Sequence, residues 1–199
     1  MLNLNVMKRI CVFCGSNGGA DPIFMETAGQ VGEFLAANNI ELVFGGGRVG
    51  LMGKIADTVM AKGGRVIGVI PESLAIKEVA HQGLTELHVV NSMHDRKALM
   101  ADLSDGFIAM PGGFGTFEEF CEIVTWAQLG IHQKPCALLN VNGFYDHLIA
   151  LFDHSAAQSF IRNEHRGLVL VGTEISSLFE SMKNYEPPVI EKWIDKSST

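Results

Sequence analysis

The sequence predicts an α/β fold, a Rossmann-like doubly wound parallel sheet with helices on both faces. Six short apolar segments alternate with segments of helical period, and this order is typical of parallel strands joined by crossover helices. The apolar segments lack the regular polar alternation of a half-exposed strand, so we expect strands that are buried on both faces. The predicted strands span residues 8–14, 41–44, 64–70, 106–110, 135–140 and 168–171.

Each predicted strand is an apolar run rich in β-branched, aromatic or aliphatic residues. The first, KRICVFC, ends at a glycine-rich turn, and the second, ELVF, runs directly into three glycines. The fourth, GFIAM, ends at the sequence PGGFGT. Helical patterns fill most of the gaps between the strands, as a doubly wound sheet requires.

The chain has the size of one domain. It contains 199 residues, of which 47% are hydrophobic and 19% charged, so it has enough apolar material for a core. We interpret residues 1–185 as a single Rossmann-like domain. Residues 186–199, which begin near the pair Pro187-Pro188, are interpreted as a C-terminal tail.

Charge and cysteine content exclude several classes of protein. Fifteen Lys and Arg residues face 22 Asp and Glu residues, a net charge of −7, so a nucleic acid polymer is not an expected partner. No apolar run is long enough to span a membrane, and we expect a cytoplasmic protein. Cys11 and Cys14 lie in one predicted strand at an odd separation, which places them on opposite faces and favours core packing. We find no spacing typical of a metal site and expect neither a metal nor a cofactor.

Three loops at the carboxyl ends of predicted strands are the candidate binding site, because ligands of such sheets bind there. Glycine lets backbone N–H groups approach an anion, and a helix N-terminus adds a favourable dipole. The glycine spacing matches neither a dinucleotide fingerprint nor a Walker A loop, and tight turns with close helix packing are the alternative interpretation. The candidate residues are Gly15 and Ser16 in the first loop, Gly45, Gly46, Gly47 and Gly50 in the second, and Gly112, Gly113, Gly115 and Thr116 in the third.

Arg96 is the candidate cation of the site. Ser92 and Asp95 have the spacing of a capping box at the start of a helix. On that helix Arg96 falls within about 60° of an apolar stripe, and Lys97 lies about 100° away. A guanidinium on a core-facing stripe requires a carboxylate or a phosphate, although snorkelling at the stripe's edge or a structural ion pair would also explain it. The stripe consists of Met93, Leu99, Met100 and Leu103.

Glu119 is the candidate carboxylate. The sequence from Thr116 to Glu119 has capping-box spacing, so Glu119 could merely close the start of a helix. Helical phase favours another role, because Glu119 shares its face with apolar residues whereas Glu118 lies about 100° off that face. Glu122 is intermediate. An inward Glu and an inward Arg beside an anion site form a plausible pair for acid–base or electrostatic catalysis.

These motifs together resemble those of the Lonely Guy family, cytokinin-activating nucleoside 5'-monophosphate phosphoribohydrolases that are often mislabelled lysine decarboxylases. Residues 111–119, PGGFGTFEE, are similar to the family motif PGGxGTxxE. The resemblance extends to CVFCGS at 11–16, GGGRVGLMG at 45–53, VIPESL at 69–74, SMHDRK at 92–97, TWAQLGIHQKP at 125–135 and LLNVNGFY at 138–145. It therefore covers the chain up to about residue 185.

The resemblance implies a homodimer that hydrolyses the N-glycosidic bond of a purine riboside 5'-monophosphate, releasing free base and ribose 5-phosphate. It implies that Arg96 and Glu119 are the catalytic pair. The expected substrate-binding residues are the glycines, Ser16 and Thr116 of the three loops, together with Met93, Lys97 and Glu122. Phe24 and Asn142 depart from the family pattern, in which Tyr and Asp are common at these positions, so the base preference stays open.

Two other functions are compatible with parts of the sequence. A nucleotide-binding or carrier protein without catalysis would have the same phosphate loops, but it has no need of an inward Glu beside an anion. A lysine decarboxylase would need a pyridoxal phosphate lysine, and Lys54, Lys97 and Lys134 are candidates only by elimination. Neither is favoured over the hydrolase.

Overall fold

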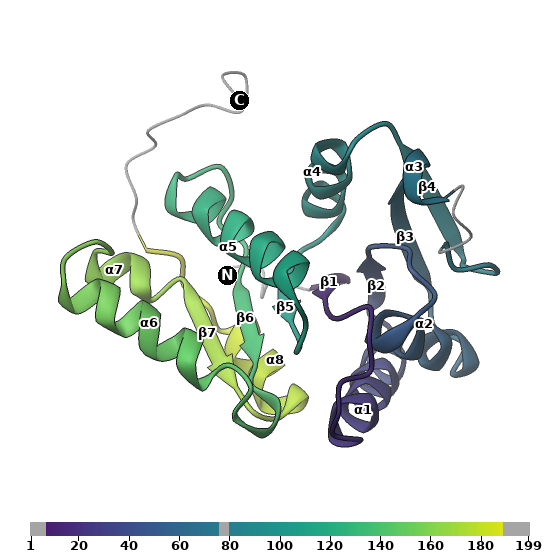
Figure 1. Cartoon of the computed structure of the whole chain (residues 1–199), viewed down its shortest axis with the longest axis horizontal. Coiled ribbons are helices and arrows are strands. Elements are labelled where there is room, and N and C mark those ends of the chain that lie inside the picture. The colour runs from purple at the N-terminus through teal and green to yellow at the C-terminus, as the bar shows by residue number, and fades with distance from the viewer. Residues whose placement is uncertain (1–6, 76–79, 189–199) are drawn as a thin grey trace, which may run out of the picture.

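A computed structural model describes residues 7–75 and 80–188 and contains one seven-stranded parallel sheet. The strand order is β4-β3-β2-β1-β5-β6-β7, and every neighbouring pair is parallel (Figure 1). This confirms the predicted fold class. Residues 189–199 of the predicted tail lie outside the described residues. The strands are β1 (Arg9–Phe13), β2 (Glu41–Phe44), β3 (Val66–Pro71), β4 (Glu86–Val90), β5 (Gly106–Ala109), β6 (Cys136–Leu139) and β7 (Val169–Gly172).

Helices cover both faces of the sheet, and a separate apolar cluster lies on each face. One cluster joins the sheet to α1, α2 and α8, and the other joins it to α4, α5 and α6. Cys14 belongs to the first cluster and Cys11 to the second, which confirms that these two cysteines pack on opposite faces. The helical elements are α1 (Ile23–Ala37), α2 (Gly50–Ala61), α3 (Glu72–Ala75), α4 (Met93–Leu103), α5 (Phe114–Gln128), η1 (Val141–Gly143), α6 (Asp146–Ala157), α7 (Asn163–Arg166) and α8 (Ile175–Lys183).

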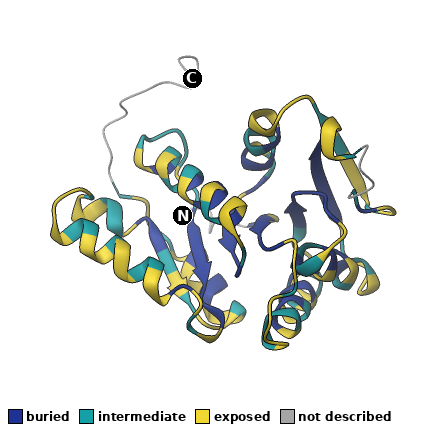
Figure 2. Ribbon diagram, viewed as in Figure 1, coloured by how far each residue is buried: buried dark blue, intermediate teal, exposed yellow. Residues whose placement is uncertain are grey.

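The six predicted strands are present, but the sequence did not predict β4. This strand lies at the edge of the sheet and is largely exposed, unlike its neighbour β3, which is buried throughout. Leu87 and Val89 are 39% and 56% exposed. An exposed edge strand lacks the continuous apolar run by which the buried strands were found. Figure 2 shows this contrast between the buried central strands and the exposed outer elements.

The strand order creates a switch point beside β1. The chain passes from β1 through β2 and β3 to β4 in one direction, and then returns to β5 on the other side of β1. The loops after β1 and β5 lead to α1 and α5, which cover opposite faces of the sheet. Chains that diverge in this way leave a crevice at the carboxyl ends of the strands. Two of the three predicted glycine-rich loops border this point.

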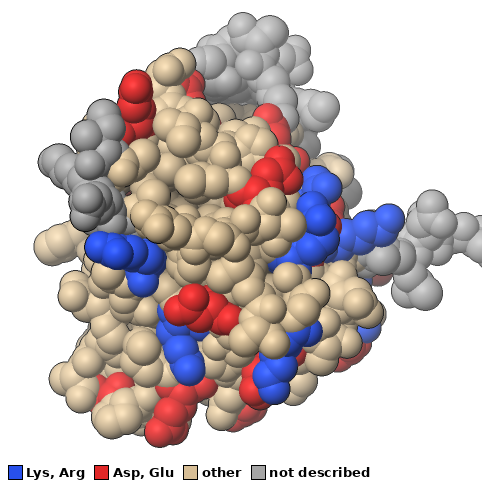
Figure 3. Space-filling view, turned by 90° about the vertical axis from the view of Figure 1, so that its right-hand side faces the viewer, with Lys and Arg blue, Asp and Glu red and all other residues tan. Residues whose placement is uncertain are grey.

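No helix among the described residues is both long and apolar enough to cross a membrane. On the face shown in Figure 3, acidic and basic side chains lie beside one another and form no continuous basic area. The described residues also contain no group of three or more His, Cys, Asp or Glu residues that could hold a metal ion.

Candidate active site

Arg96 is a buried cation on the inner side of α4. The helix begins as the sequence predicts, with Ser92 as N-cap accepting a hydrogen bond from the Asp95 backbone N–H. The Arg96 residue is 8% exposed, its Nε donates to the Val69 carbonyl at 3.1 Å, and its Nη1 donates to Oε1 of Glu119 at 2.6 Å. The guanidinium is thus held at two points inside the protein. Snorkelling at the edge of the stripe is therefore wrong as an explanation of this residue.

Glu119 faces inward from the second turn of α5. The helix begins at Phe114 with Gly113 as N-cap and no side-chain cap, so Thr116 lies inside the helix. The capping-box interpretation of Glu119 is wrong, because the helix starts three residues earlier than that motif requires. Glu119 is 9% exposed and turns its carboxylate to Arg96.

The surroundings of Glu119 act on the pKa of its carboxyl in opposite directions. Burial raises the pKa of the Glu119 carboxyl above its ordinary value, while the charge and hydrogen bond of Arg96 lower it and the charge of Glu118 raises it further. The net direction is upward. A buried carboxyl with a raised pKa beside a single cation is typical of catalytic sites, although structural ion pairs also perturb pKa values.

A second set of ion pairs, between Lys97 and two carboxylates, also joins α4 to α5 and lies nearer the surface. Nζ of Lys97 lies 2.5 Å from Oε1 of Glu118 and 2.9 Å from Oε2 of Glu122. Burial lowers the pKa of Lys97, but the two carboxylates outweigh it and the net direction is upward. The Glu118 side chain is 55% exposed, which confirms that Glu119 is the inward residue of the two. These pairs connect α4 to α5 above the sheet.

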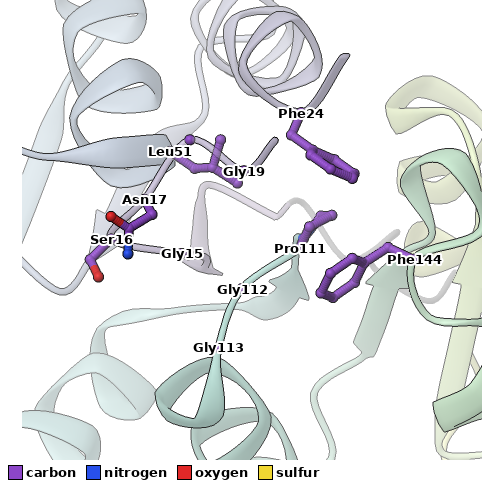
Figure 4. Close-up of a pocket in the computed structure, with 11 residues that line it drawn as sticks. Gly15, Ser16, Asn17, Gly19, Phe24, Leu51, Pro111, Gly112, Gly113 and Phe144 are labelled. Carbon is purple, nitrogen blue, oxygen red and sulfur yellow. The ribbon is translucent and has the colours of Figure 1, made fainter. Parts of the chain in front are cut away.

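A cavity of about 190 Å³ lies at the carboxyl ends of β1 and β5, beside the start of α5 (Figure 4). The loops after β1 and β5 form its wall and are joined where the Gly15 N–H donates to the Pro111 carbonyl at 3.0 Å. Two phenyl rings, of Phe24 and Phe144, meet edge to face with centroids 5.9 Å apart. The cavity is lined by Gly15, Ser16, Asn17, Gly18, Gly19, Phe24, Leu51, Pro111, Gly112, Gly113 and Phe144.

The ion pair does not line this cavity but lies one helical turn beyond it. Thr116 and Glu119 are three residues apart on α5 and share a face. A Cβ at position 112 would lie 2.1 Å from Oγ1 of Thr116, so Thr116 packs directly against Gly112 of the cavity wall. The contact of Gly112 with Thr116 therefore links the cavity to the charged pair.

Packing within the protein accounts for the glycines of the second loop. A Cβ at position 45 would lie 1.8 Å from Nη2 of Arg96, so the missing side chain of Gly45 makes room for the guanidinium. Gly46 and Gly50 have φ angles of +73° and +62°, and a Cβ at position 50 would meet the Ser16 carbonyl carbon at 2.3 Å. Gly47 is buried and forms an isolated bridge with Ala80. Close packing, the alternative interpretation of this loop, fits these glycines without a ligand.

The third loop differs, because two of its glycines have open space around them. A Cβ at Gly113 or Gly115 would meet nothing within 4 Å. These positions belong to the N-cap and first turn of α5, where free backbone N–H groups and the helix dipole favour an anion. Packing explains Gly112 of this loop, but it does not explain Gly113 and Gly115.

Two other predicted residues, Met93 and Ser16, are exposed. Met93 is the first residue of α4 and is 45% exposed. It therefore does not join the buried stripe beside Arg96. Ser16 is exposed on the first loop. The sequence did not predict the cavity contribution of Phe144, which comes from the loop after β6. That loop is recognisable as a neighbour only once β6 is known to lie beside β5.

Comparisons with known proteins identify the family. A family model described as "Possible lysine decarboxylase" matches residues 52–182. A protein of Oryza sativa subsp. japonica named as a probable cytokinin riboside 5'-monophosphate phosphoribohydrolase is 51% identical over 177 residues, covering 89% of this chain and 79% of that protein. The cytokinin riboside 5'-monophosphate phosphoribohydrolase of Rhodococcoides fascians is 48% identical over 178 residues, covering 89% and 90%. The chain belongs to this phosphoribohydrolase family.

Solved structures similar to this member of the phosphoribohydrolase family share its fold. A molybdenum cofactor binding protein of Rippkaea orientalis has a TM-score of 0.67 at 23% identity, covering 88% of this chain and 95% of that chain. The molybdenum cofactor carrier protein of Chlamydomonas reinhardtii has a TM-score of 0.67 at 20% identity, with the same coverage. At this level of identity the likeness supports the Rossmann-like fold alone.

Proposed function

We propose that this phosphoribohydrolase family member hydrolyses the N-glycosidic bond of a purine riboside 5'-monophosphate to free base and ribose 5-phosphate. The observation that carries the proposal is the buried pair of Arg96 and Glu119, one helical turn from the open N-terminus of α5. The relatives of 46 to 51% identity are named for this reaction on cytokinin ribotides. A buried carboxylate and an anion site at this separation suit a substrate that carries a phosphate remote from the bond to be cleaved.

The 5'-phosphate would bind at the start of α5. Gly113 and Gly115 leave space for an anion close to the backbone, and Thr116 adds a hydroxyl on the inner face of the helix. The helix dipole favours negative charge there. Binding energy from the phosphate can position the ribose, which explains why a ribotide and not a riboside is the expected substrate.

Glu119 would act on the ribose carbon C1'. When the bond from C1' to the purine nitrogen breaks, its electron pair leaves with the base and positive charge develops on the ribose ring. The Glu119 carboxylate can stabilise that charge or take a proton from the attacking water. The water oxygen becomes the C1'–OH of ribose 5-phosphate, and the proton removed from the water is passed on to the departing base nitrogen, directly or through solvent, so that neutral base is released and the carboxylate is regenerated. Arg96 favours the ionised form of the buried carboxyl, against the effect of burial, and fixes its position by bonding to it and to the Val69 carbonyl.

The surrounding residues of the predicted site have supporting roles in this proposal. Lys97 and Glu122 hold α5 against α4 through their ion pair, and Met93 lies at the rim where a base could contact it. Gly15, Ser16 and Gly112 line the cavity beside the phosphate position. Gly45, Gly46, Gly47 and Gly50 shape the loop that receives the guanidinium.

A carrier that binds the nucleotide without cleaving it is the second function to test. The cavity and the start of α5 would serve a carrier equally well. A buried carboxylate near a phosphate, however, weakens anion binding by like-charge repulsion and gives a carrier no benefit. The position of Glu119 therefore favours hydrolysis.

The label of the family model, lysine decarboxylase, finds no support in the lysines near the site. A Schiff base with pyridoxal phosphate requires an uncharged amine. Lys97 is held between two carboxylates that raise its pKa, so its ammonium form is stabilised. Lys134 donates to the Ala101 carbonyl at 2.7 Å, at the opposite end of α4 from Arg96's turn.

We further propose that the protein acts as a homodimer in the cytoplasm. Helix α6 has no buried residue, and it carries Leu151, which is 56% exposed, while Phe160 shortly after the helix is 89% exposed. Exposed apolar patches mark surfaces at which proteins associate. The four cysteines are free, and three of them are buried, which fits a reducing compartment. The dimer is tested by sedimentation, and the expected result is twice the chain mass.

Incubation with AMP tests the proposed reaction. We expect free adenine and ribose 5-phosphate in equal amounts, no adenosine, and much slower release of adenine from adenosine itself. AMP recovered intact after binding would support the carrier instead. Release of inorganic phosphate and adenosine would show a phosphatase and contradict the proposal.

A further inference from the structure

Tyr145 is a buried residue whose hydroxyl reaches the loop at the start of α5. It is 1% exposed and lies between η1 and α6, far along the chain from that loop. Its hydroxyl donates to the Met110 carbonyl at 2.6 Å. Met110 is the residue directly before Pro111, Gly112 and Gly113, the segment that leads into α5.

The hydroxyl replaces a partner that the sheet does not supply at this point. The pairing of β5 with β6 ends at Ala109 opposite Leu138. The Met110 N–H still donates to the Phe13 carbonyl of β1 at 2.9 Å, but the Met110 carbonyl lies beyond the end of the ladder and accepts its hydrogen bond from the Tyr145 hydroxyl. A buried carbonyl needs a donor, and Tyr145 provides it where β6 has turned away.

Tyr145 is itself fixed on several sides. Its backbone N–H donates to Oδ1 of Asn140 at 2.7 Å, and Nδ2 of Asn140 donates to Oδ1 of Asp146 at 2.7 Å. Its ring meets the rings of Phe144 and Phe117 at nearly perpendicular angles, with centroids 5.0 and 6.3 Å away. Phe144 lines the cavity and Phe117 belongs to the first turns of α5. One side chain therefore touches the loop, the helix start and the cavity wall.

We propose that Tyr145 is a positioning residue that holds the segment from Met110 to Gly113 in the conformation that binds the 5'-phosphate. This inference rests on the proposed function, because it takes the start of α5 as the phosphate site. The hydroxyl is the informative part of the side chain, since phenylalanine would fill the same apolar space. Burial raises the pKa of the Tyr145 phenol, so the group remains a protonated donor throughout the physiological range.

The test compares Tyr145→Phe with the matched control Ser104→Ala. Ser104 is also buried, and its hydroxyl donates to a backbone carbonyl, that of Met100 at 2.8 Å, at the end of α4 and away from the phosphate loop. Four constants are measured for each protein: KM and kcat for AMP, the inhibition constant of ribose 5-phosphate, and the inhibition constant of adenosine, which lacks the phosphate. Melting temperatures report the loss of stability separately.

For Tyr145→Phe we expect KM for AMP and the inhibition constant of ribose 5-phosphate to rise together by about tenfold, the effect of one lost buried hydrogen bond. The adenosine constant and kcat should remain near their wild-type values. Ser104→Ala should lower the melting temperature and leave all four constants unchanged. If Tyr145→Phe does not fold, Asn140→Ala, which removes the acceptor of the Tyr145 N–H, should raise the same two constants.

Other outcomes would contradict either the role of Tyr145 or the phosphate site on which it rests. Equal effects of Tyr145→Phe and Ser104→Ala on the kinetic constants, or a change in melting temperature alone, would show that Tyr145 is only a core residue. Unchanged constants in folded Asn140→Ala would contradict it as well. If the wild-type protein binds ribose 5-phosphate no better than ribose, the phosphate site of the proposed function fails, and the role of Tyr145 fails with it.

Discussion

The Arg96 guanidinium and the Glu119 carboxylate face each other across 2.6 Å from two different helices, both of them buried on the same side of the sheet. Neither charge would be tolerated there without the other, because a buried charge without a partner lowers the stability of the fold. Removing one partner of such a pair costs about 3 to 5 kcal/mol of folding free energy. The pair therefore depends on the way α4 and α5 are placed by β3 and β5. Substitutions in this pair can distinguish a catalytic role from a purely stabilising one.

Replacing Arg96 tests the two-point attachment of the guanidinium. Lysine keeps the charge but cannot bond to both the Val69 carbonyl and Glu119 in the planar geometry of arginine. We expect Arg96→Lys and Arg96→Met both to fold and to lose most AMP hydrolysis. The measurements are adenine release and thermal unfolding, and near-native turnover in either variant would remove Arg96 from the catalytic account.

Gly45→Ala and Gly113→Ala form a matched pair of glycine substitutions. A Cβ at position 45 would displace the Arg96 guanidinium, so we expect a lower kcat and a lower melting temperature. A Cβ at position 113 meets open space in the protein, so we expect unchanged stability and a raised KM for AMP because the methyl group occupies the approach of the phosphate. A wild-type KM in Gly113→Ala protein would show that the phosphate binds elsewhere.

The pH dependence of kcat follows from the burial of Glu119. Its ionised form is the active one, and burial raises its pKa, so activity should fall on acidification at a higher pH than the ordinary glutamate pKa of about 4.3. Saturating AMP is used because kcat then reports groups of the bound complex. The acid limb should disappear from the residual activity of Glu119→Gln, and an unchanged limb in that variant would assign it to another group.

Local sequence patterns predicted the inward direction of Arg96 and Glu119, because helical period depends on neighbouring residues alone. They failed where the deciding partner is distant. Thr116 resembles an N-cap, yet the helix already begins at Phe114, and Gly45 resembles a phosphate glycine, yet its space is filled by Arg96. The roles of Phe144 and Tyr145 depend on the adjacency of β5 and β6, which the sequence does not encode locally.

The exposed edge strand β4 was missed for a related reason. Its residues alternate in exposure, and a strand of five residues with Glu86 and His88 in it carries little apolar signal. The buried strands were found within one or two residues of their ends because continuous apolar runs are rare outside a parallel sheet core.

The most direct test of the central claim is kcat for AMP in Glu119→Gln compared with Glu118→Gln. The two residues are adjacent, but Glu119 is buried against Arg96 whereas the Glu118 side chain is 55% exposed and bonded to Lys97. If Glu119 acts in the transition state, its substitution lowers kcat by about 10² to 10⁴-fold with little change in AMP affinity, and that of Glu118 does much less. Equal losses in the two variants, or a loss of melting temperature alone in Glu119→Gln, would contradict the account.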